Sequence, residues 1–494
     1  MERSPFAEVR ELRGELRHWR RSRANATLGQ AISDAYIGIF AFLMLSSMLI
    51  NALIGVSGLS DEHCTSTGCQ AARGVMPWVV AGLGLVVIWS LARTFGPIQA
   101  SPASASWLLD TPLDRGAVLR ARVWAAFAIV AVAGAVVAGT AALLGGFGLP
   151  AAVGFATLVG AFAAAGVLLG VLGQPARANP LTAVTVVVLT AAWATLLALT
   201  LHRVPTVEAP ADVPAWWWLA IVLCFGVVLV GVVSAAQLAR RLRRRDLVRG
   251  GALVPGLGGA LATLDLALTY DVLLAHRWRG RGTARPRRGG PSGSAALIWA
   301  DLTRIRRSPV WLFLLALGVV VPYAVRTAGA ERVVILAAAG TAFLALLPFL
   351  AGLRVLTRTA GVARQFPNGL GATRGAALVV PASLAGLFGL ACVPAVHAGV
   401  EVLWSTAVLL GVAAGACGLA ASVRWVTGRP PDYGRPLVAS PAGAVPTNLY
   451  GSVLRGFDIL LLTSAPFLIA PTQTGALFSL MIAFICLSYF AGRK

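Results

Sequence analysis

Two basic loops hold most of the residues in this chain whose types and spacing could do chemistry. An aromatic side chain set among small residues and followed by charged ones can insert into a partner protein's pocket and surround the contact with polar interactions. We therefore predict that both loops dock a protein. The alternative is that the aromatic residues anchor the loops at a membrane surface and the arginines contact lipid phosphate. The candidate residues are Trp107, Leu108, Asp110, Asp114 and Arg115 in the first loop and Arg364, Phe366 and Arg374 in the second.

Catalytic motifs are absent from the sequence. It has no H-E-x-x-H or G-x-S-x-G motif, and Lys494 is the only lysine, so no P-loop can form. The apolar segments hold almost no ionisable residues, whereas ion-coupled carriers and intramembrane enzymes need them there. We therefore predict a transport subunit that is not an enzyme and binds no metal or cofactor. If ATP drives it, ATP and Mg²⁺ bind to a separate ATPase.

The composition predicts the elements that must position these loops. The chain is 57% hydrophobic and 12% charged, whereas soluble proteins are about 25% charged. This balance predicts an all-α, polytopic membrane protein. A transmembrane helix needs about 20 mostly apolar residues, and twelve segments qualify: 31–55, 75–92, 124–145, 148–172, 180–201, 214–238, 309–325, 333–353, 376–396, 402–423, 457–471 and 474–491. The last two could also form one broken hairpin.

The order of features repeats once along the chain. Each half has a basic amphipathic segment, at 4–23 and 295–307, that leads into Arg-Arg-Ser. Two apolar segments, a basic loop and four further apolar segments follow, and each loop ends in Arg-Gly-Ala. We predict two parallel six-helix repeats, each preceded by an amphipathic elbow helix. The predicted domains are 1–239 and 295–494, joined by a basic cytoplasmic linker at 240–294.

The net charge of +22 is distributed over the loops in a regular way. Basic and acidic loops alternate along the chain, which is the positive-inside pattern. This pattern predicts a multi-pass protein of the plasma membrane with both termini in the cytoplasm. Basic segments next to the membrane should bind anionic lipid head groups. Since membrane orientation explains the charge, we do not expect a nucleic-acid partner.

Two of the six cysteines lie in the first predicted outer loop. Cys64 and Cys69 are close in sequence, and an exported loop is in an oxidising compartment, so we predict a disulfide between them. The alternative is a metal site that also uses His63, but three ligands in so short a loop are a weak metal signal. The other four cysteines are predicted to be small core residues.

The first loop resembles that of a known family. Ser106-Trp107-Leu108-Leu109, then Thr111-Pro112-Leu113 and a basic residue, is similar to the loop between the second and third spans of ABC-2-type permeases. In those permeases the loop forms a coupling helix that docks on an ATPase. This chain resembles two permease units fused into one. Its later segments, 431–433, 441–446 and 454–458, are similar to those of permease-like proteins of high-GC Gram-positive bacteria.

The resemblance implies the permease subunit of an ABC exporter, with two ATPase subunits as partners. The second loop has no counterpart of Asp110 or Asp114, which predicts unequal docking sites and ATPases that need not be identical. An uncharged interior favours a lipid-like cargo or an amphipathic peptide or glycolipid. A secondary carrier and a non-transporting membrane scaffold or signalling partner are the alternatives. One chain per complex, a homodimer and further subunits all stay open.

Overall fold

A computed structural model gives the fold. It describes residues 67–100, 102–107, 114–174, 180–201, 210–253, 256–257, 266–279, 290–366, 369–428, 438–440, 443–445 and 454–492, with Glu11, Gly14 and Glu15. The chain forms two compact units. Unit 1 comprises Met1–Thr195 and Val204–Pro255, and unit 2 comprises Leu196–Arg203 and Gly256–Lys494. One boundary between the units, after Pro255, therefore falls inside the predicted linker, and two others enclose Leu196–Arg203.

Ten helices of the described residues are long and apolar enough to cross a membrane. Each predicted apolar segment from 75–92 onward coincides with a helix, although Phe457–Ile469 is shorter than the other spans. These helices confirm a helical, multi-pass membrane protein. The predicted first span, 31–55, lies outside the described residues, so the twelve-span repeat stays a prediction.

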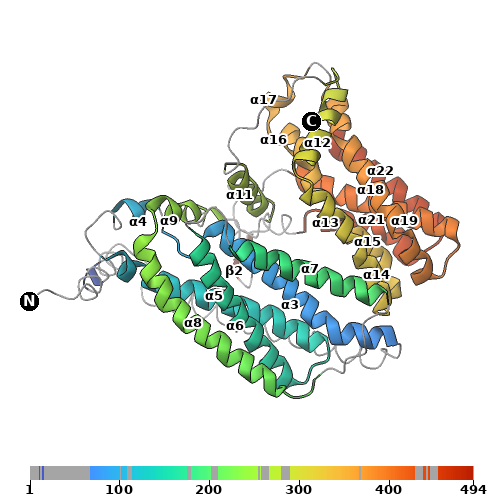
Figure 1. Ribbon diagram of the computed structural model, residues 1–494. Helices are drawn as coiled ribbons and strands as arrows, with labels where there is room; N and C mark the ends of the chain where they lie inside the picture. Colours follow the sequence, from blue (N-terminus) through green and yellow to red (C-terminus); the bar gives the residue numbers. More distant parts are fainter. Residues whose placement is uncertain are drawn as a thin grey trace, which may run out of the picture. The chain divides into compact units, whose positions relative to one another are not determined.

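Unit 1 is built around helix α6. Its long helices are α3 (Thr67–Phe95), α5 (Arg115–Leu144), α6 (Leu149–Gly173), most of α7 (Pro180–Thr200, in unit 1 up to Thr195) and α8 (Ala215–Arg241), with the short helices α4 (Pro102–Trp107) and α9 (Arg244–Gly251) at one end (Figure 1). Helix α6 packs against α3, α5 and α8. Small residues allow this close approach: a Cβ at Gly160 would lie 2.7 Å from the Ala131 carbonyl oxygen of α5.

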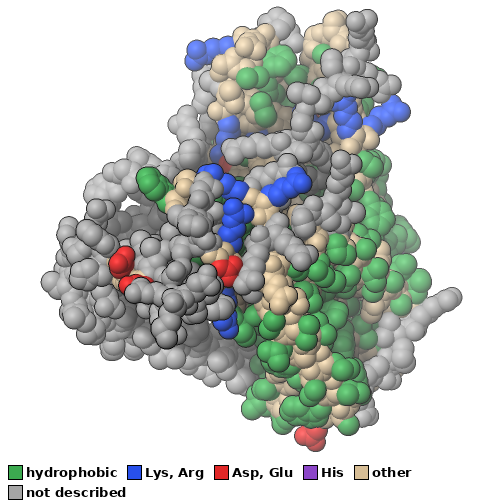
Figure 2. Space-filling model, turned by 60° about the vertical axis from the view of Figure 1, so that its left-hand side comes forward, with side chains coloured by type: hydrophobic (Ala, Val, Ile, Leu, Met, Phe, Trp, Pro, Cys, Tyr) green, Lys and Arg blue, Asp and Glu red, His purple; other side chains and the backbone are tan. Residues whose placement is uncertain are grey.

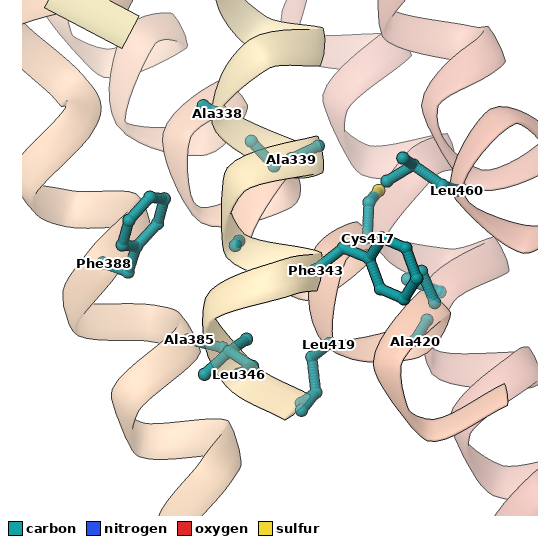
Figure 3. Close-up of a cluster of buried hydrophobic side chains, with 14 of the residues drawn as sticks. Ala338, Ala339, Phe343, Leu346, Ala385, Phe388, Cys417, Leu419, Ala420 and Leu460 are labelled. Carbon is teal, nitrogen blue, oxygen red and sulfur yellow. The ribbon is translucent and has the colours of Figure 1, made fainter. Parts of the chain in front are cut away.

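Unit 2 is built around helix α19. Its elements are α11 (Leu266–Arg279), α12 (Ala295–Arg307), α13 (Val310–Gly318), α14 (Val320–Thr327), η1 (Glu331–Val333), α15 (Val334–Leu346), η2 (Leu347–Leu350), α16 (Ala351–Arg358), α17 (Ala360–Ala363), α18 (Leu370–Val400), α19 (Trp404–Thr427), β1 (Val438–Ser440), β2 (Gly443–Val445), α21 (Phe457–Ile469) and α22 (Gln473–Gly492). Helix α19 packs against α15, α18, α21 and α22. Figure 3 shows part of this core, where Phe343 of α15 lies beside Cys417 of α19.

The two units share an order of packing. In each, the second, third and sixth spans of the predicted repeat surround the fourth: α3, α5 and α8 contact α6, and α15, α18 and α22 contact α19. Helix α19 also packs against α21, the fifth span of its half. The antiparallel pair β1–β2 is the one departure from an all-helical fold among the described residues.

The elbow predicted at 295–307 is helix α12, Ala295–Arg307. Trp299 and Leu302 are exposed on it, while Asp301 is buried. The predicted counterpart at 4–23 lies outside the described residues apart from Glu11, Gly14 and Glu15. Figure 2 shows hydrophobic side chains gathered in a broad surface with arginines beside it, as expected for helices that face lipid.

Candidate docking surface

The first loop is held firmly where it leaves α3. Gly96 has a φ of +75°, a left-handed conformation that favours glycine, and it turns the chain away from the helix axis. The Gln174 side-chain amide at the end of α6 donates to the Ile98 carbonyl oxygen at 3.0 Å. The Arg122 guanidinium of α5 donates to the Gln99 carbonyl oxygen at 2.9 Å. Two helices therefore fix the backbone that leads into α4.

Helix α4 buries one side and exposes its last residue. Ala105 is fully buried, in a cluster that includes Leu119 and Val123 of α5. Trp107 is 79% exposed. A six-residue helix has little stability of its own, so its packing on unit 1 must hold it in place. The result is a large aromatic side chain that a fixed base presents to solvent.

Helix α9, from the predicted linker, forms part of that base. The Ala100 N–H donates to the Leu247 carbonyl oxygen at 3.0 Å. Leu242 and Leu247 are buried in the same cluster as Ala105. At Gly250, an added Cβ would lie 1.3 Å from the Phe95 carbonyl oxygen, so no other residue fits there without moving the helix. Figure 1 shows α4 and α9 together at the same end of unit 1.

The charged residues predicted in the first loop have local roles that the structure makes visible. Asp114 is the N-cap of α5, and its carboxylate accepts from the Gly116 N–H at 3.1 Å. This cap fixes where the loop ends. Arg115, the first residue of α5, is half-buried. Leu108 and Asp110 lie outside the described residues.

The second loop presents its predicted residues differently. Arg364 is exposed, but Phe366 is half-buried and packs against the core of unit 2. Arg374 is buried, and its guanidinium donates to the Ala491 carbonyl oxygen at 3.1 Å. A cation that binds the last carbonyls of a helix stabilises that helix end. Arg374 therefore caps α22 and does not offer its charge to a partner.

A polar junction in unit 2 was not predicted from the sequence. Asp271 of α11 forms ion pairs with Arg354 and, at 2.8 Å, with Arg358 of α16. The Arg354 guanidinium also lies 4.8 Å from the centre of the Tyr270 ring. The adjacent Tyr270 and Asp271 could have suggested that α11 packs against another helix. Nothing in the sequence identified Arg354 and Arg358 as the residues that they contact.

Asp301 of the elbow helix is a second buried charge of unit 2. Its carboxylate pairs with Arg304 at 2.5 Å, and burial raises the pKa of the Asp301 carboxyl although Arg304 opposes the shift. Beside this pair lies a cavity of about 40 Å³, lined also by Tyr270, Trp311 and Phe349. A cavity of this size has room for a water molecule, and it is too small for a transported molecule.

Metal and disulfide predictions fall mostly outside the described residues. Within those residues, no group of three or more His, Cys, Asp or Glu side chains could hold a metal ion. Cys69 is disulfide-bonded, whereas Cys224, Cys392, Cys417 and Cys486 are free thiols. His63 and Cys64 are not among the described residues, so the Cys64–Cys69 pairing stays a prediction.

Comparison with known proteins places the chain in a family. A family model described as a family of unknown function, DUF6297, matches residues 69–436, and the chain belongs to this family. The matched range contains α4, α9 and the whole predicted linker. No curated protein and no solved structure is significantly similar to the chain.

Proposed function

We propose that this member of the DUF6297 family is the permease subunit of an ATP-driven transporter, and that a separate ATPase docks on α4 of unit 1. The single observation that supports this proposal best is Trp107. It is the last residue of a short helix whose other side is buried, and it is 79% exposed. A fixed aromatic side chain of this kind is typical of the residues that dominate binding to a partner protein.

The chemistry of the described helices also favours this function over a secondary carrier. Their charged side chains lie near helix ends, as Arg354, Arg374, Arg424 and Asp458 do. Arg374 and Arg424 make contacts that stabilise the fold, to α22 and to Asp458. A carrier driven by protons or ions needs ionisable groups along its path. Energy would instead have to come from a partner, through a docking surface such as α4.

The same helices bear on the class of cargo. Their apolar, Gly- and Ala-rich faces offer few groups that could replace the hydration shell of an ion or a sugar. We therefore favour export of a lipid-like molecule or an amphipathic peptide or glycolipid. A membrane scaffold that keeps the docking surface and has lost transport would present Trp107 in the same way, so the test must measure both binding and ATP turnover.

The test compares Trp107→Ala with Trp218→Ala after affinity purification of the tagged chain in mild detergent. Trp218 is 57% exposed in the first turn of α8, away from α4, and is the matched control. We expect the wild-type chain and the control to retain a P-loop ATPase and to stimulate its turnover. Removing a central aromatic residue from an interface costs about 2 kcal/mol or more, which is a roughly 30-fold loss of affinity.

Three results would argue against the proposal. Retention of the ATPase by Trp107→Ala at unchanged affinity would exclude α4 as its docking site. A bound ATPase whose turnover the chain never alters would favour the scaffold. Transport that follows a proton gradient and continues without ATP would establish the secondary carrier.

A further inference from the structure

We propose that helix α9 of the linker is part of the docking surface, and that Arg243 and Arg244 at its start help to select an ATPase groove with an acidic rim. This inference rests on the proposed function, since it specifies the partner of the same site. The structure gives three independent reasons: α9 packs beside α4, its leucine is already buried, and the exposed charged side chains that the structure describes near α4 are arginines.

The first reason is mechanical. The Ala100 N–H donates to Leu247, and the Gly250 backbone lies directly against Phe95, the last residue of α3. Ala105 of α4 shares its buried cluster with Leu247. A partner that binds Trp107 therefore meets α9 in a defined position beside it, and not as a loose basic segment.

The second reason separates a protein partner from the membrane. An interfacial helix binds a bilayer by burying a free apolar face in it. In and around α9 the apolar side chains are already used within unit 1, because Leu242, Leu247 and Leu253 are buried. The described charged residue of α9, Arg244, is exposed, as is Arg243 directly before the helix. Such a helix contributes charge to an interface but little apolar area, as expected at the rim around a central aromatic residue.

The third reason is the sign of the charge. Five arginines near this end of unit 1 are exposed: Arg93 of α3, Arg120 and Arg122 of α5, Arg243 before α9, and Arg244 in its first turn. The described acid in the same region is Asp114, which caps α5; Asp246 adds one negative charge to the sequence of α9. Complementarity then requires a partner surface with carboxylates around a pocket that accepts Trp107.

Unit 2 offers a weaker version of this surface. Phe366 is half-buried and Arg374 is buried against α22. The linker helix of unit 2, α11, uses Asp271 to pair with α16. The tight, charge-selected contact is therefore expected on unit 1.

The experiment uses charge reversal. Arg243→Glu/Arg244→Glu is compared with Arg306→Glu/Arg307→Glu, which makes the same change in charge at exposed positions of the elbow helix α12. The probe is the ATPase that purifies with the wild-type chain, identified by mass spectrometry and then purified alone. Its affinity for each variant is measured in detergent at about 0.1 M and about 1 M salt, because the Debye length falls from about 10 Å to about 3 Å between them.

We expect the α9 variant to bind the ATPase at least about 10-fold more weakly at low salt, with a smaller difference at high salt. The α12 variant should bind like the wild type. Reversing carboxylates in the groove of the ATPase to lysine should restore affinity for the α9 variant alone. Size-exclusion profiles and melting temperatures of all variants show whether they are folded.

The failures are distinguishable. If the wild-type chain binds no ATPase, both the proposed function and this inference are overturned. If Trp107→Ala releases the ATPase but the α9 variant binds it normally, only the inference is overturned. If the α9 variant keeps its ATPase affinity and instead loses bound phosphatidylglycerol in native mass spectra, the arginines bind the membrane and the inference is wrong.

Discussion

Replacing Asp271 with asparagine tests whether the linker helix α11 is a structural part of unit 2. Asp271 pairs with two arginines of α16, Arg354 and Arg358. The Arg354 side chain is only 7% exposed, while the Asp271 and Arg358 side chains are 27% and 28% exposed. The Arg354 Nη2 also lies 3.5 Å from the Ala267 carbonyl oxygen. The substitution Asp271→Asn would keep the shape of the side chain and remove its charge.

The expected cost follows from the burial of the two partners. Removing one member of a fully buried ion pair costs about 3–5 kcal/mol, because the other charge is left uncompensated. Asp271 is partly exposed, and water there would compensate part of the loss. We therefore expect about 2–3 kcal/mol, which corresponds to a roughly 30- to 150-fold increase in the population of molecules in which α11 has separated from α16.

Hydrogen exchange of the peptide over Leu266–Arg279 measures that population directly. The control is Asp458→Asn. Asp458 pairs with Arg424 at 3.4 Å, and its side chain is 40% exposed. The control substitution would keep a side-chain oxygen for the Gly456 and Ile459 N–H groups, which now donate to the Asp458 carboxylate. Its expected cost is below about 1 kcal/mol.

Two results would refute this reasoning. The first is exchange over α11 that is no faster in Asp271→Asn than in the control. The second comes from a double-mutant cycle with Arg354→Met, which removes the buried charge that Asp271 compensates. In that background Asp271→Asn should cost much less. If its cost is unchanged, the ion pair with Arg354 is not what holds α11.

Three further predictions concern single contacts. Gly250→Val should displace α9 from the carbonyl oxygen of Phe95 and abolish ATPase co-purification without loss of helix content in circular dichroism. Arg374→Met removes the hydrogen bond to Ala491, so exchange in the last turn of α22 should rise about 10-fold, as expected for the loss of a bond from a charged donor. Burial raises the pKa of the Asp301 carboxyl; its contribution to stability is thus full below the unfolded pKa of about 4 and is lost as the pH rises through the raised folded value. Asp301→Asn should flatten this part of the melting temperature's pH profile.

The sequence was sufficient to place the helices that are long and apolar enough to cross a membrane, and to place helix α12. Hydropathy is a local property, since about 20 apolar residues must span the hydrocarbon whatever their neighbours are. The predicted elbow at 295–307 coincides with α12 for a related reason, because its apolar spacing and terminal arginines are also local. The exposure of Trp107 agrees with a docking role.

The packing of the linker could not be predicted in this way. Helix α9 is short and basic and contains one leucine, Leu247, and its position depends on burial of Leu247 and of the preceding Leu242 against unit 1. The Gly250-Gly251 pair was the one local signal, since adjacent glycines at a helix end often mark a close backbone approach. The role of Asp271 likewise depends on arginines far away in the sequence.

The repeated tripeptide Arg-Gly-Ala shows that identical local sequences can have different surroundings in the fold. Arg115 and Arg374 occupy equivalent positions at the start of α5 and near the start of α18. Arg115 is half-buried at the edge of the first loop, whereas Arg374 is buried against Ala491 of α22. A short motif fixes the type of residue but not its surroundings. Here the end of α22 determines whether the arginine is available to a partner.

The two linker helices attach at corresponding places in their units. These parts of the linker therefore belong to the packed structure of each unit. Helix α9 lies against Phe95, the last residue of α3, and α11 pairs with Arg358, the last residue of α16. Each is thus fixed where the second span of the predicted repeat ends and its loop begins. The residues that the family model matches, 69–436, include this region. A flexible tether could be deleted or replaced without harm to the domains it joins, whereas deleting this linker would remove packed side chains from the base of both loops.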